Sequence, residues 1–122
     1  MTLYQSLVED LLAVGIDVES MTLVVRPFHS RYHGRYLFDK RKAYVYAYED
    51  KGCTRPRHYC DVLETAIHEG VHHMMNLAGV NAKGQAHGDE FCNACDHYML
   101  AAKKMGLSDK TFVNLDEVRK GS

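Results

Sequence analysis

The sequence predicts a single α+β domain in which a leading helix and a small antiparallel hairpin-based sheet precede two long helices. Apolar residues recur at helical spacing near the N-terminus and again in the second half of the chain. Between these two regions lie β-rich segments joined by a polar turn. The chain has 122 residues, which is enough for one packed core, so we expect residues 1–122 to form one domain.

The first half of the chain is expected to supply one helix and the strands. A first helix should run from Thr2 and stop at Gly15, because glycine is a common helix end. Its apolar positions at helical spacing are Leu3, Leu7, Leu11 and Val14. Residues 21–28, MTLVVRPF, are typical of a short strand. Residues 34–39 and 42–50 are β-rich, and the polar turn at 40–42 between them predicts a hairpin.

Two further helices are expected after Pro56, where the β-rich region ends. Asp61 and Glu64 resemble a helix N-cap with its capping box, so the first of these helices should run from Asp61 to Gly79. Residues 80–88 are rich in Gly, Asn and Gln and predict a loop. The last helix should begin near Asp89 and end before residue 106, which is a glycine.

The composition is typical of a soluble globular protein, because apolar residues make up 46% of the chain and charged residues 25%. No apolar run is long enough to cross a bilayer, so we expect no membrane partner. Glu9 and Asp10 interrupt the apolar N-terminus, and no positively charged leader precedes them. We therefore expect a cytoplasmic protein, with nucleoid and nucleus as compatible intracellular sites. In that reducing setting four residues should be thiols rather than disulfides: Cys53, Cys60, Cys92 and Cys95.

The helix expected after Pro56 carries AIHEGVHHMMN, in which His68, Glu69 and His72 form the motif H-E-x-x-H. Four residues are slightly more than one turn, so the two histidines should lie about 6 Å apart on one face and reach one zinc ion. Glu69 lies one step round the helix, where it can act on water as a general base. Gly70 costs about 1 kcal/mol relative to alanine in a helix, which a close neighbour or a substrate groove would explain.

Three further histidines could complete the site, because a catalytic zinc needs a third protein ligand. His73 points about 100° away from His72 on the helix, which suits the rim of the site better than the metal. His97 lies deep in the last helix and could line the site. His87 stands just before that helix, where Gly88 permits a tight turn. We favour His87 as the third ligand.

The motif HEGVHH and, after a loop of fourteen residues beyond His72, the motif HGDEF together resemble the pattern of the SprT-like metallopeptidase family. This family includes the Spartan proteases of DNA–protein crosslink repair, and the firm match covers residues 66–91. The resemblance implies a zincin-like minimal metallopeptidase domain with two metal-bearing helices. It implies one Zn²⁺ per chain at His68, His72 and His87, with Glu69 as the catalytic acid/base. The 122 residues lack the paired C-x-x-C zinc ribbon of larger relatives, which leaves recruitment to other surfaces.

The expected activity is hydrolysis of a peptide bond in a protein or peptide substrate by a metal-activated water. Four residues near the motifs are candidates for orienting the ligands or stabilising the oxyanion: His73, Glu90, His97 and Tyr98. Asp89 and Glu90 also suit a helix N-terminus, whose dipole favours acidic side chains.

A basic and aromatic segment lies between Arg26 and Arg57, where nine Lys or Arg residues face three acids. Seven aromatic residues alternate with them, a mixture that could bind single-stranded DNA by phosphate contacts and base stacking. The candidate contacts are Arg31, Arg35, Arg41, Lys42, Arg55 and Arg57. A solvated hairpin with alternate aromatics facing the core would give the same pattern.

Two other functions are compatible with these motifs. A DNA-binding module with a structural zinc and no protease activity would need a fourth protein ligand, such as His97 or a cysteine. A general peptidase without nucleic acid would differ only in the role of the basic segment.

Overall fold

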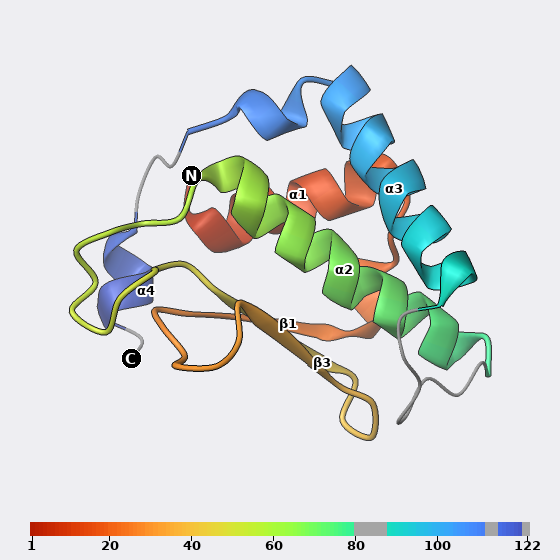
Figure 1. Ribbon diagram of the computed structural model, residues 1–122, viewed down its shortest axis with the longest axis horizontal. Coiled ribbons are helices and arrows are strands. Elements are labelled where there is room, and N and C mark those ends of the chain that lie inside the picture. Colours follow the sequence, from red (N-terminus) through yellow and green to blue (C-terminus); the bar gives the residue numbers. More distant parts are fainter. Residues whose placement is uncertain (80–87, 112–114, 121–122) are drawn as a thin grey trace.

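The computed structural model describes residues 1–79, 88–111 and 115–120 as a mixed α+β fold. Its helices are α1 (Leu3–Val14), α2 (Tyr59–Leu77), α3 (Asp89–Lys104) and α4 (Asp116–Lys120), and its strands are β1 (Thr22–Arg26), β2 (Gly34–Leu37) and β3 (Lys42–Tyr46). Two 3-10 turns, Val18–Ser20 and Leu107–Asp109, complete the order. In Figure 1, α1 and α2 lie on one side of the sheet, and α3 packs against α2. Within the described ranges, no helix is both long and apolar enough to cross a bilayer.

Helix α1 confirms the predicted leading helix at both ends. Thr2 is its N-cap: the threonine hydroxyl accepts from the Gln5 amide, and the Gln5 side chain accepts from the Thr2 amide. Gly15 ends the helix with φ +96°, a conformation that glycine adopts at little cost. The predicted apolar stripe of α1 is buried in the core.

The sheet is mixed, which corrects the prediction of an antiparallel sheet. Strands β2 and β3 form the predicted antiparallel hairpin, but β1 pairs with β3 in parallel, so the order is β1-β3-β2. After β1 the chain crosses to the far edge of the sheet, and the hairpin then brings it back to the centre. Ala43 and Val45 of β3 are fully buried in the core with the helices. Side chains alternate along a strand, so Tyr44 and Tyr46 lie on the opposite face.

Helix α2 begins at Tyr59, two residues before its predicted start, and ends at Leu77, two residues before its predicted end. The capping box at Asp61 and Glu64 was wrong, because Asp61 lies inside the first turn and its amide donates to the His58 carbonyl. Buried Tyr59 anchors this first turn by donating a hydrogen bond to the carboxylate of Asp10 on α1. The Asp10 carboxylate also accepts from Lys110, at 2.7 Å.

Gly70 lies where α2 crosses Ile16, a fully buried residue that follows α1. A Cβ on Gly70 would stand 2.9 Å from a methyl carbon of Ile16, closer than carbon atoms pack. Of the two explanations for this mid-helix glycine, the structure therefore supports the close neighbour. Helix α3 confirms the predicted last helix, from Asp89 to Lys104.

Candidate metal centre

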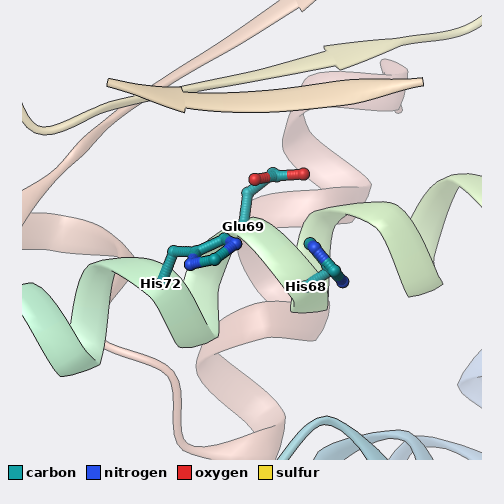
Figure 2. Close-up of side chains that lie close together, drawn as sticks. All are labelled: His68, Glu69 and His72. Carbon is teal, nitrogen blue, oxygen red and sulfur yellow. The ribbon is translucent and has the colours of Figure 1, made fainter. Parts of the chain in front are cut away.

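The motif residues His68, Glu69 and His72 form a cluster on the middle of α2 (Figure 2). One potential ligand atom from each side chain lies within 4.8 Å of the other two, and the two imidazole centroids are 5.1 Å apart. Both histidines are half-buried, whereas Glu69 is buried, and its carboxylate points towards the sheet in Figure 2. Helical spacing alone brings these groups together, because four residues make about one turn.

Phe91 of α3 covers the two motif histidines. Its ring centroid lies 4.8 Å from that of His68 and 4.3 Å from that of His72. The start of α3 therefore packs directly on the candidate centre, and Phe91 restricts the rotation of both imidazoles. His87, the predicted third ligand, lies outside the described residues.

Two aromatic residues of the hairpin approach the other side of His72. The Tyr36 ring stacks on His72 at 6.4 Å, and Phe38 meets it edge-on at 5.7 Å. Neither Tyr36 nor Phe38 was named as a site residue from the sequence. Their i, i+2 spacing in GRYLFD was the available signal, because alternate residues of a strand share one face.

His73 is fully buried and lies in a polar network under the site. Its Nε2 is hydrogen-bonded to the Ser20 hydroxyl at 2.7 Å, and its Nδ1 to the Tyr36 hydroxyl at 2.6 Å. Asn76 donates to the same Tyr36 hydroxyl at 3.1 Å. Burial lowers the pKa of His73, so the neutral imidazole is favoured. Both nitrogens of His73 are thus engaged, and Tyr36 connects His73 to His72 by a hydrogen bond and a ring contact.

Glu69 lies in a narrow space between α2 and the start of β2. A Cβ on Gly34 would stand 2.4 Å from the Thr65 methyl carbon and 2.8 Å from a Glu69 carboxylate oxygen, so only glycine fits there. Burial raises the pKa of Glu69 to about 8. A nearby cation favours the charged form of a carboxylate, so the chemistry of the two imidazoles and this acid is compatible with a divalent metal ion at the cluster.

Two hollows open on either side of His68. The smaller, about 280 Å³, lies between residues 31–34 and α2 and is lined by Thr65 and Glu69. The larger, about 460 Å³, lies between α2 and α3 and is lined by Ile67 and Met99 among others. A polypeptide passing over His68 would have space on both sides of the motif.

The other predicted supporting residues lie on α3. Glu90 is exposed in its first turn and His97 is exposed further along, whereas Tyr98 is half-buried. The ring of His97 contacts that of Tyr98, at 5.3 Å. None of the three belongs to the potential metal-binding cluster found among the described residues. The four cysteines all lie among the described residues, and none of them forms a disulfide there.

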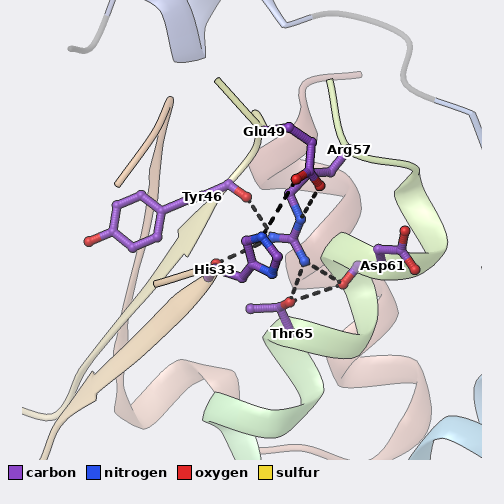
Figure 3. A network of polar contacts seen from close by, with 6 residues as sticks. All are labelled: His33, Tyr46, Glu49, Arg57, Asp61 and Thr65. Carbon is purple, nitrogen blue, oxygen red and sulfur yellow. Dashed lines mark hydrogen bonds and ion pairs between the residues drawn. The ribbon is translucent and has the colours of Figure 1, made fainter. Parts of the chain in front are cut away.

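The predicted nucleic-acid contacts do not share one environment. Arg31, Arg35, Arg41 and Arg55 are exposed, and Lys42 is half-buried. The burial of Arg57 argues against its predicted role as a nucleic-acid contact. Arg57 is only 5% exposed, and its guanidinium donates to the Tyr46 carbonyl at 2.7 Å and the Thr65 hydroxyl at 2.7 Å (Figure 3). Its charge is used inside the protein, which a count of basic residues cannot reveal.

The structure groups other basic and aromatic residues in a hollow of about 750 Å³ on the sheet face opposite α2. Its lining includes Arg26, Lys51, His29, Tyr44 and Tyr46, with no carboxylate among the described lining residues. The rings of Tyr44 and Tyr46 are nearly parallel, at 6.5 Å and 10°. Figure 3 shows Tyr46 projecting away from α2.

Comparisons of the chain with family models, with curated proteins and with solved structures found no match.

Proposed function

We propose that the protein is a zinc-dependent peptidase of the SprT-like, zincin-like type. The observation that carries this proposal is the cluster of His68, Glu69 and His72, in which a buried acid stands beside two imidazoles on one helix. A structural zinc site does not require a buried acid one step away from its ligands, whereas hydrolysis needs a base there.

In this proposal His68 and His72 hold the zinc together with His87. Support for His87 comes from Phe91, four residues later, which touches both motif histidines and ties the start of α3 to the centre. Tyr36 orients His72 by stacking, and His73 holds Tyr36 by its hydroxyl. Such outer contacts set the angle at which an imidazole meets its metal.

Zinc bound there would supply Lewis-acid chemistry, which acidifies water and polarises a carbonyl. Glu69 would accept the proton of the attacking water and return it to the leaving amine. The buried setting of Glu69 suits the first step, because burial raises the proton affinity of its carboxylate. The hollows beside His68 would receive the substrate chain.

Removal of the metal tests this proposal. The purified protein should contain about one zinc per chain, and chelation should abolish cleavage of an unfolded protein such as casein. One equivalent of zinc should restore cleavage. Full cleavage by a chelated protein with no measurable zinc would contradict the metallopeptidase proposal.

We propose as a second function that the sheet face opposite α2 binds single-stranded nucleic acid. The specific observation is the acid-free hollow, in which Arg26 and Lys51 flank Tyr44 and Tyr46. The half-buried Tyr44 ring could stack on an unpaired base, and the two cations could contact phosphates, whereas Tyr46 is buried beside Tyr44. A peptidase with such a face could act on proteins crosslinked to DNA, as the family resemblance implies.

Binding of labelled single-stranded DNA measures this second function. Tyr44→Ala should weaken binding about tenfold at low salt, because each stacked base contributes roughly 1–3 kcal/mol. Affinity of the parent should also fall steeply as salt rises, since phosphate contacts release counterions. The matched control is Tyr4→Ala, which removes an exposed tyrosine of α1.

Two charge-reversal variants test whether the hollow itself binds the nucleic acid. Arg26→Glu and Arg55→Glu alter net charge equally, but only Arg26 lines the hollow. Equal weakening by both, together with parent-like binding by Tyr44→Ala, would exclude this face as the binding site. A general peptidase without nucleic acid would then be the better description.

A further inference from the structure

We propose that Arg57 is a positioning residue of the peptidase, because it fixes the gap between the hairpin and α2 through which a substrate would reach Glu69. This inference rests on the proposed function and adds to it a residue outside both sequence motifs. It concerns geometry alone, since Arg57 itself lies behind the wall of the site rather than in it.

The guanidinium of Arg57 links the two walls of the small hollow (Figure 3). On the hairpin side, its Nη1 donates to the carbonyl oxygens of Tyr46 at 2.7 Å and His33 at 3.3 Å. On the helix side, its Nη2 donates to the Asp61 carbonyl at 3.2 Å and the Thr65 hydroxyl at 2.7 Å. One planar group therefore bonds both the end of the hairpin and the first turns of α2.

Thr65 carries this link into the candidate site. Its hydroxyl accepts from Arg57, and its methyl carbon is the atom nearest to the missing Cβ of Gly34. The next nearest atom there is a carboxylate oxygen of Glu69. Thr65 stands one turn before Glu69 on the same face of α2, so a shift of the hairpin at Gly34 changes the space around the general base.

The same walls enclose the hollow of about 280 Å³ beside Glu69. Its lining includes His33 and Gly34 from the hairpin and Thr65, His68 and Glu69 from α2. His33 and Thr65 are both bonded to Arg57. Loss of the guanidinium would therefore alter the width of the space in which the scissile bond must lie.

The burial of Arg57 explains why this link needs an arginine. The side chain is only 5% exposed, and burial lowers its pKa, although Glu49 at 3.8 Å opposes that effect. Lysine would keep the charge but offers one ammonium in place of a planar fork, so it cannot bond four acceptors on two walls at once.

Thr65→Val and Arg57→Lys test the inference. Valine keeps the volume and methyl group of Thr65 but removes the acceptor hydroxyl, so the fold should survive. A displacement near 1 Å at a reacting group can reduce rates about a hundredfold, so kcat for casein cleavage should fall about ten- to a hundredfold in each variant. Zinc content per folded chain should equal that of the parent.

Lys110→Met is the matched control for a general loss of stability. It removes the ion pair with buried Asp10 of α1, which is bonded to Tyr59 and does not line the hollow. Its melting temperature should fall as far as that of Thr65→Val, yet its kcat, measured well below melting, should equal the parent value. The kcat of the double variant Arg57→Lys/Thr65→Val should be no lower than that of the less active single variant, because both changes break the same link.

The outcomes separate this inference from the proposed function. An active, zinc-dependent parent whose Thr65→Val variant keeps full kcat overturns the role of Arg57 and leaves the peptidase intact. Equal losses of kcat in Lys110→Met and Thr65→Val also overturn it, because stability alone would then explain both. A zinc-loaded parent with no peptidase activity overturns the proposed function, and this inference with it.

Discussion

Glu69→Gln should retain its zinc and its fold while losing about a hundred- to ten-thousandfold of its peptide-hydrolysing rate. Glutamine has nearly the size of glutamate but cannot accept the proton of the attacking water. Burial already disfavours the charged form of Glu69 and raises its pKa to about 8, so the neutral amide should be tolerated in the same space. Metal analysis and kcat/KM for an unfolded protein substrate would measure the two effects separately.

Glu9→Gln is the matched control, because it makes the same chemical change at an exposed position of α1. It should cleave substrate at the parent rate. If Glu69→Gln also turned over at the parent rate, the protease mechanism would be excluded. The DNA-binding module with a structural zinc would then be the better proposal.

The helices could be predicted from sequence because their signals are local. The stripe beginning at Leu3 and the stop at Gly15 depend on residues within a few turns of each other, and α1 follows both. The start of α2 was missed by two residues because Tyr59 is anchored to Asp10, a contact across 49 positions that no local pattern contains.

The sheet shows the limit of such patterns more clearly. The hairpin of β2 and β3 follows from alternation and a short turn, but the parallel pairing of β1 with β3 depends on where the chain goes between Arg26 and Gly34. Alternation identifies the two faces of a strand without saying which strand lies beside it. The consequence for function is the basic and aromatic hollow, because Arg26 meets Tyr46 only in this parallel register.

The candidate site also has features that local sequence predicts and features that depend on other elements. His68 and His72 were expected to converge because helical geometry alone brings them together, and the cluster does so. The cover of Phe91 and the stacking of Tyr36 come from other elements. Arg57 was misassigned because charge in a sequence says nothing about burial, and its guanidinium is directed at backbone carbonyls instead of solvent.

His87→Ala should lose most of the zinc that the parent holds, measured per folded chain after dialysis against a weak chelator. A site left with two imidazoles keeps too few protein ligands to compete for the ion, because zinc sites need at least three. The folded state of the variant should be checked separately, since bound metal stabilises the chain that holds it. His68→Ala, which removes a ligand within the described cluster, gives the reference for an emptied site.

His97→Ala is the control that separates the candidate third ligands, because His97 is exposed on α3 and should not affect the zinc content. His73→Ala is less informative, since this buried imidazole bonds Ser20 and Tyr36 and its loss should destabilise the fold itself. Full zinc in His87→Ala together with an empty site in His97→Ala would assign the third ligand to α3. The resemblance between HGDEF and the family motif would then be coincidental. The position of His97 on α3 would then determine which side of the metal is open to substrate.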